Sequence, residues 1–259
     1  MARHTASILH RAFPVAGRRF AVIDPGTRAH KILVVESRWG RLRLLRRQTI
    51  EVDEGDPEAP LSLREQLVAA LPELGDERLA LVLPQHRTIS TVLDVPQDAT
   101  DAGRFIEAEV RKVSGLSEEE LFHAHRPLEP FGQRRAPHFV TLCKRQELDG
   151  FIEGLIPPTQ GSSESADNDR LIEVVTTGQA MFSAVLAGAS PPTHAVVVDL
   201  GASHTVVGIV LNGQGVHATS FDGGSSRFTD ALAAESTDGW AAAEVRKRTT
   251  NVLAVPHVS

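Results

Sequence analysis

Short apolar runs separated by turn residues characterise the first fifty positions of the chain. The run 20–23 stops at Asp24-Pro25-Gly26-Thr27, and two further strand-like runs cover residues 31–36 and 42–52. Alternation of apolar and polar residues over such short runs is typical of β-strands, and a tight turn joins antiparallel neighbours. The three runs therefore predict an antiparallel meander.

Strand-like and helix-like patterns follow one another through the rest of the chain. Apolar runs predict strands at 79–83, 88–95, 121–128, 138–144, 171–175, 195–198, 205–211 and 215–221. Helical spacing of apolar residues predicts helices at 63–71, 98–113, 146–156, 178–186, 226–234 and 240–247. The polar stretch 157–169 contains Pro, Gly, Ser, Asn and acidic residues, which is typical of a mobile linker. The pattern as a whole predicts an α/β protein.

One pattern occurs twice. Asp24-Pro25-Gly26-Thr27 and Asp199-Leu200-Gly201-Ala202 each follow a short apolar strand and each open a predicted three-stranded meander. Either turn alone is equally compatible with an ordinary turn. The two copies together indicate an internal duplication.

The duplicated turns contain residue types that suit phosphate binding. Glycine lets backbone N–H groups approach a phosphate closely, and a neighbouring hydroxyl adds a donor. A carboxylate at a strand end can hold hydrated Mg²⁺, and Lys31 can reach a phosphate as a point charge. Two such hairpins facing each other would clamp a nucleotide tail, and the pair favours this interpretation over two unrelated turns.

Composition excludes several classes of protein. The chain has 259 residues, 41% of them apolar, and a net charge of -6, which is ordinary for a globular protein. Aromatic residues make up 5% and Tyr is absent, which leaves little material for stacking nucleic-acid bases. A single cysteine, Cys143, excludes an internal disulfide framework and a multi-cysteine zinc site. No apolar run is long enough to span a bilayer.

Charge is unevenly distributed along the chain. Residues 1–50 contain eleven Lys or Arg and two acidic residues, whereas residues 151–240 contain two Arg and ten acidic residues. The basic region can attract an anionic membrane surface or an acidic partner. It is also compatible with a solvated strand face, because arginines and leucines interleave over 41–47.

The chemistry-bearing residues resemble those of a known superfamily. Asp24-x-Gly26-Thr27-x-x-x-Lys31 and Asp199-x-Gly201 are similar to the two phosphate motifs of the actin-like ATPases. The segments between and after them resemble the type IV pilus assembly protein PilM, a relative of the cell-division protein FtsA. These segments are 81–84, 88–96, 105–109, 140–145, 151, 223–229 and 243–247.

The resemblance implies a fold and a domain organisation. It implies an α/β, actin-like fold of duplicated RNase-H-like lobes, with an FtsA/PilM-type inserted α+β subdomain. The expected parts are a flexible N-terminus at 1–19, part of the first lobe at 20–84, the inserted subdomain at 85–156, the linker at 157–169, and the rest of the first lobe with the start of the second at 170–259. The C-terminal part, which carries the family's adenosine-packing Gly-Gly motif, is expected to be truncated.

The resemblance also implies a binding site. ATP and Mg²⁺ are the implied cofactors, with Asp24 and Asp199 at the metal. The implied cofactor-binding residues are Asp24, Gly26, Thr27, Lys31, Asp199, Gly201, Ser203, Gly223 and Gly224. No catalytic residue is implied, so we expect at most a weak ATPase.

The implied role is that of a scaffold. PilM-like proteins are cytoplasmic and dock the cytoplasmic N-terminal peptide of the inner-membrane protein PilN, beside the inserted subdomain. We therefore expect a PilN-like partner, inner-membrane association through that partner, no nucleic acid, no membrane span of the chain's own, and possible homo-oligomers.

Three alternatives stay open at this point. The chain could be the cytoplasmic domain of a GspL-type secretion protein, which shares the fold. It could be an actin-fold sugar or acid kinase, although that reaction needs a well-placed catalytic carboxylate. Finally, His123-x-His125 could contribute to a metal site, but two solvated strand histidines explain the pair more simply.

Overall fold

A computed structural model describes residues 18–38, 41–51, 78–155, 171–235, 237 and 239–249. The predicted helix at 63–71, the predicted linker at 157–169, and nearly all of the predicted flexible N-terminus lie outside the described residues.

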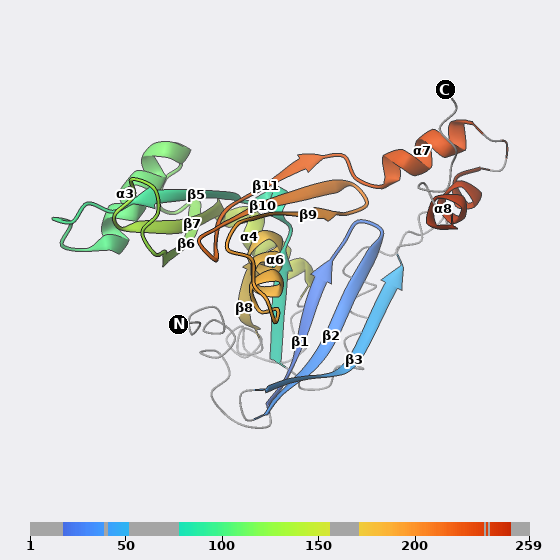
Figure 1. The fold of residues 1–259 in the computed structure, drawn as a ribbon, viewed down its shortest axis with the longest axis horizontal. Coiled ribbons are helices and arrows are strands. Elements are labelled where there is room, and N and C mark those ends of the chain that lie inside the picture. The colour runs from blue at the N-terminus through green and yellow to red at the C-terminus, as the bar shows by residue number, and fades with distance from the viewer. Residues whose placement is uncertain are drawn as a thin grey trace.

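The first lobe is built on a five-stranded mixed sheet (Figure 1). Its strands, in the order β3-β2-β1-β4-β8, are β3 (Arg41–Glu51), β2 (Ala29–Arg38), β1 (Arg18–Pro25), β4 (Arg78–Leu83) and β8 (Leu171–Thr176). The meander β1-β2-β3 is antiparallel, as its tight turns require, and β4 and β8 run parallel to β1. The interior strand β4, between β1 and β8, is apolar at nearly every position because both of its faces are buried.

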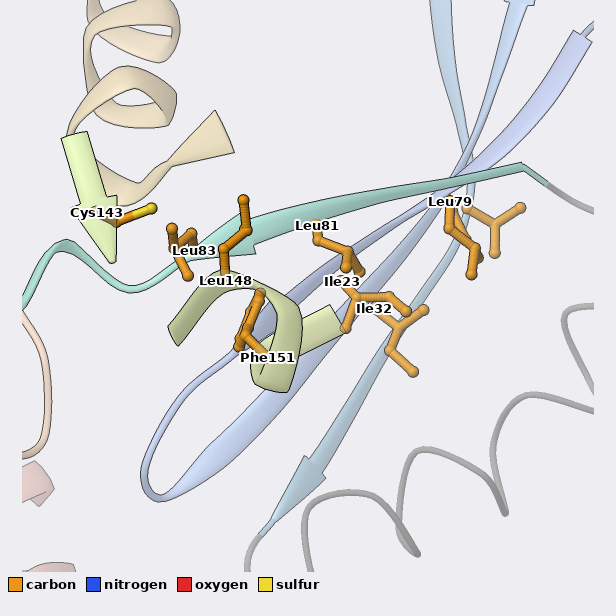
Figure 2. Close-up of a cluster of buried hydrophobic side chains, with 10 residues drawn as sticks. Ile23, Ile32, Leu79, Leu81, Leu83, Cys143, Leu148 and Phe151 are labelled. Atoms are coloured by element: carbon orange, nitrogen blue, oxygen red, sulfur yellow. The ribbon is translucent and has the colours of Figure 1, made fainter. Parts of the chain in front are cut away.

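One face of this sheet is covered by α4 (Arg145–Leu155). Leu148 and Phe151 of the helix pack against Ile23, Leu81 and other strand residues in one cluster (Figure 2). Burying each such side chain stabilises the fold by roughly 1.5–3 kcal/mol. This helix was predicted as part of the inserted subdomain at 85–156, whereas its apolar face packs on the sheet of the first lobe.

Between β4 and β8 the chain forms a small α+β unit. It contains β5 (Ile89–Asp94), α3 (Ala102–Ser114), β6 (Leu121–Pro127) and β7 (Pro137–Lys144), with strand order β5-β7-β6. The side chain of Asp101 accepts hydrogen bonds from the N–H groups of Gly103 and Arg104, which caps α3. Ile106 and Val110 of α3 are fully buried against this sheet.

The second lobe repeats the meander of the first. Strands β9 (Ala195–Leu200), β10 (His204–Leu211) and β11 (Gln214–Asp222) form an antiparallel sheet in the order β11-β10-β9. Among the described residues β9 pairs with β10 alone, whereas its counterpart β1 is also flanked by β4. The sheet is followed by α7 (Ser226–Ala234) and α8 (Gly239–Thr249).

Two features join the parts of the molecule. Helix α6 (Thr177–Leu186) places Phe182 between the second sheet and the ring of Phe139 from β7. The two rings meet edge to face, with their centroids 6.2 Å apart. Gln85 belongs to the short 3₁₀ turn η2 (Gln85–Arg87) and is 2% exposed. Its side chain donates to Thr88 and Ser90 and accepts from the N–H of Gly178, so it links η2 to the start of α6.

Candidate functional site

The two duplicated turns have the same backbone geometry. In the first, the N–H of Gly26 donates to the carbonyl of Ala29 at 3.1 Å, and in the second Gly201 donates to His204 at 3.0 Å. The strand register is also repeated, because Asp24 lies opposite Lys31 and Asp199 lies opposite Val206. Equivalent positions of the two turns are therefore 175 residues apart in the sequence, as Asp24 and Asp199 are.

Glycine is required in both turns for a steric reason. A Cβ atom on Gly26 would lie 2.5 Å from the carbonyl oxygen of Ala29, and one on Gly201 would lie 2.8 Å from that of His204. Both distances are shorter than the contacts that real Cβ atoms make, so a side chain at either position would force the backbone to move. Each turn is thus a narrow backbone cradle without a side chain at its base, as close approach to a phosphate needs.

The turns face each other across the junction of the lobes. The hydroxyl oxygens of Thr27 and Ser203 are 2.9 Å apart and share a hydrogen bond. Burial raises the pKa of Asp24, Lys31 opposes that rise, and the charge of Asp199 adds to it. The carboxylates of the two turns are therefore close enough to interact. Lys31 Nζ lies 3.7 Å from Asp24 Oδ2, so the cation reaches the first turn.

Gly223 and Gly224 are placed behind the second turn. The N–H of Gly223 donates to the carbonyl of Ser203, and the N–H groups of Ser225 and Ser226 donate to Gly201 and Ala202. A Cβ on Gly224 would lie 2.4 Å from two carbonyl oxygens of that turn. The segment 223–226 therefore supports the second turn by contacting its carbonyl groups. The N–H groups of that turn lie elsewhere along its backbone.

A pocket opens beside the paired turns. It has a volume of about 320 Å³ and is lined by Arg28 and Glu51 of the first lobe and by Ser225, Trp240, Glu244 and Lys247 of the second. The guanidinium of Arg28 lies 4.1 Å from the centre of the Trp240 ring, a cation–π contact across the two lobes. Arg28 and Trp240 are not among the site residues predicted from the sequence. The resemblance included the 243–247 segment but gave neither Glu244 nor Lys247 a role in the site.

Glu244 is the centre of an ionic network at the wall of this pocket. Its carboxylate accepts a hydrogen bond from Thr229 at 2.5 Å and pairs with Lys247 at 2.6 Å and Arg248 at 2.9 Å. Burial opposes ionisation of Glu244, but the hydrogen bonds from Lys247, Thr229 and Arg248 outweigh it and lower its pKa to about 2. Because Thr229 lies on α7 and the other three on α8, the network fixes one helix against the other.

This network predicts an acid-sensitive contribution to stability. A carboxylate whose pKa is lower in the folded protein stabilises it above the pKa of the unfolded chain, near 4.5 here, and loses that effect as the pH falls towards 2. After allowance for solvent screening we expect about 1–2 kcal/mol. Urea unfolding at pH 5 and pH 3 should show a smaller pH dependence for Glu244→Gln than for the native chain. The exposed Glu235→Gln serves as control, and equal pH dependence in all three proteins would contradict the expectation.

The second turn is also in contact with η2. The rings of His86 and His204 stack with centroids 4.1 Å apart, and His204 Nε2 lies 3.5 Å from Asp222. Burial lowers the pKa of His86, and His204 and Arg87 lower it further. The lowered pKa favours the neutral form of His86 at neutral pH, and the ring stack links the second turn to η2.

The site suits a hydrated magnesium ion and a polyphosphate. Mg²⁺ is usually held by one or two carboxylates together with waters and phosphates, and Asp24 and Asp199 offer two carboxylates between two glycine cradles. Within the described ranges no group of three or more His, Cys, Asp or Glu side chains could hold a metal by itself. His123, His125 and His138, whose rings lie near one another on β6 and β7, do not form such a group.

Comparison with known proteins identifies the fold. No protein-family model matches the chain, and no curated protein matches it. Among solved structures, the chain is similar to the "PilM-PilN type IV pilus biogenesis complex", with a TM-score of 0.64, 19% identity, and coverage of 89% of this chain and 69% of that one. The fold is thus the predicted PilM-like, actin-like α/β fold.

Two further structures resemble the chain more distantly. One is the cytoplasmic domain of EpsL, an inner-membrane component of the Vibrio cholerae type II secretion system, with a TM-score of 0.48, 13% identity, and coverage of 83% of this chain and 75% of that one. The other is a protein of unknown function with an actin-like ATPase fold from Bacteroides thetaiotaomicron, with a TM-score of 0.48, 12% identity, and coverage of 90% and 77%.

Proposed function

We propose that this protein is an actin-like scaffold of a type IV pilus assembly platform, which docks the cytoplasmic N-terminal peptide of a PilN-like inner-membrane protein. The observation that carries the proposal is the similarity to the PilM-PilN complex over 89% of the chain. That coverage extends beyond the two turns, which many actin-like proteins share. This similarity supports the proposal that the protein is cytoplasmic and is held at the inner membrane by its partner.

The open edge of β6 is the proposed docking place. In the described sheet β6 pairs with β7 on one side only, so its other edge can accept an extended peptide as an added strand. Phe122 on this strand is 40% exposed, and the guanidinium of Arg145 lies 5.9 Å from its ring. On α3, by contrast, Ile106 and Val110 are buried in the subdomain's own core, so that face of the helix is not open to a peptide.

A peptide must gain apolar contacts to bind there. Ordering each backbone residue costs roughly 1–2 kcal/mol, so hydrogen bonds to a strand edge alone give weak binding. An apolar peptide side chain packed against the Phe122 ring would supply part of the difference. We therefore expect Phe122 to contribute strongly to affinity.

The experiment uses fluorescence anisotropy and a labelled peptide with the cytoplasmic N-terminal sequence of a PilN-like inner-membrane protein. Phe122→Ala should weaken binding by roughly tenfold or more, as loss of a central aromatic contact does. The control is Phe228→Ala, which removes another exposed phenylalanine, on α7 and outside this subdomain, and should bind like the native chain. Absence of binding by the folded native chain would overturn the proposal, and would then favour the GspL-type alternative.

The same proposal includes a Mg²⁺–ATP site between the two turns, with little or no turnover. Its support is the pair of glycine cradles, the two neighbouring carboxylates and the adjacent pocket. When bound, Mg²⁺ would neutralise phosphate charge. Asp24 and Asp199 would hold the ion through its waters, Lys31 would face the phosphates, and the hydroxyl groups of Thr27 and Ser203 would offer them further donors.

A further inference from the structure

The far end of the β2–β3 hairpin carries a basic and apolar surface to which none of the roles above assigns a function. Arg41, Arg43 and Arg47 are exposed on β3, and Leu42, Leu44 and Leu45 among them are 51%, 56% and 37% exposed. Among the described strands β3 lies at the edge of its sheet and pairs with β2 alone. Isolated exposed leucines need no explanation, but three within four residues on a basic edge strand do.

The strand register separates the two kinds of side chain. Arg41 and Arg43 lie opposite Arg38 and Glu36 on one face of the hairpin, whereas Leu42 and Leu44 lie opposite Ser37 and Val35 on the other. A hollow of about 670 Å³ is lined by Glu36, Arg38, Arg41, Leu42 and Arg43. No acidic side chain in the described part of the chain forms an ion pair with Arg41, Arg43 or Arg47, so their charge is available to a ligand.

We propose that this end of the hairpin docks on a bilayer surface that contains anionic lipids. The hairpin would enter this surface end-on, so that both of its faces contact lipid. Lipid phosphates complement the arginines of one face, and the boundary between headgroups and acyl chains accepts the leucines of the other. Arginine can keep its guanidinium among the headgroups while its aliphatic stem lies in the apolar layer. A nucleic acid would use the arginines but leave the leucines in water, and the chain's low aromatic content gives it little to stack on bases.

The position of the surface is compatible with the proposed scaffold role. Residues 30–38 of β2 span roughly 26 Å at about 3.3 Å per residue, so the hairpin end lies at the opposite end of the strand from the first phosphate turn. Figure 1 shows this end pointing away from the inserted subdomain. A membrane contact here would leave both turns and the edge of β6 accessible.

Vesicle co-sedimentation tests the proposal without any peptide or nucleotide, so its outcome is independent of the proposed function. The full chain should bind vesicles of equal parts phosphatidylcholine and phosphatidylglycerol at low salt, and should bind phosphatidylcholine vesicles far less. Arg41→Gln with Arg43→Gln should lower the partition coefficient about 25-fold, at about fivefold per arginine. Leu42→Ser with Leu44→Ser should lower it by a similar order. All four side chains are exposed, so these variants should fold, which circular dichroism verifies.

The matched control is Arg104→Gln with Lys112→Gln, two exposed cations of α3 with side chains 88% and 75% exposed. This variant loses the same charge and should bind like the native chain. Equal loss in the control would show adsorption by overall charge and overturn the proposal, as would no preference for anionic vesicles. Binding of duplex DNA that depends on the two arginines, without vesicle binding, would identify a nucleic-acid surface instead. An unaffected leucine variant would also contradict docking at the acyl boundary.

Discussion

Replacing Phe182 with alanine should lower the free energy of unfolding by about 3–5 kcal/mol, the usual cost of removing a buried phenylalanine. Phe182 is 3% exposed, and its ring occupies the space where Gly208 and Gly215 lack side chains. A Cβ on Gly215 would lie 2.3 Å from this ring, so the second sheet is shaped around it. The ring also meets Phe139 of β7, so its loss should loosen the inserted sheet from the second lobe.

Urea unfolding followed by circular dichroism measures the expected loss. Phe228→Ala is the control, because Phe228 is 58% exposed and should change stability by less than about 0.5 kcal/mol. Hydrogen exchange provides a second readout, in which β7 and β10 should lose protection together. A loss below about 1 kcal/mol would show that the two sheets do not depend on this contact.

Replacing Gly224 with alanine should destabilise the second phosphate turn. The new Cβ would lie 2.4 Å from the carbonyl oxygens of Gly201 and Ala202, and neither backbone atom can move without distorting the turn. Forcing extra atoms into a packed site lowers the free energy of unfolding by about 1–3 kcal/mol, and we expect a loss in the upper part of that range. Because the displaced carbonyls belong to the turn that would cradle phosphate, any Mg²⁺–ATP affinity should fall by roughly tenfold or more.

Thermal unfolding and isothermal titration with Mg²⁺–ATP measure the two effects separately. The control is Gly150→Ala in α4, where a Cβ meets nothing within 4 Å and alanine should be neutral or stabilise the helix by about 0.5–1 kcal/mol. An unchanged Tm for Gly224→Ala would contradict the supporting role of this segment. No heat from the folded native chain would show that the turns do not bind ATP, while leaving the stability prediction intact.

Residues near one another in the sequence determined much of the fold. The short apolar runs at 20–23 and 195–198, together with the two Asp-x-Gly turns, predicted both meanders, because strand and turn signals depend on neighbouring residues. The spacing of Ile106 and Val110 predicted α3 and its buried face for the same reason. The 175-residue repeat also predicted that the two turns would meet across the lobes, which the contact between Thr27 and Ser203 bears out.

The tertiary structure alone decided which distant surfaces meet. An amphipathic pattern shows that α4 has an apolar face, but not that this face covers the first sheet rather than the inserted one. Nothing local indicates that Arg28 lies over Trp240, or that Gly224 is required by carbonyl groups of a turn more than twenty residues earlier. Periodicity reports whether a side chain is buried, whereas the identity of its neighbours depends on how whole elements pack, and that packing is settled by contacts between residues far apart in the sequence.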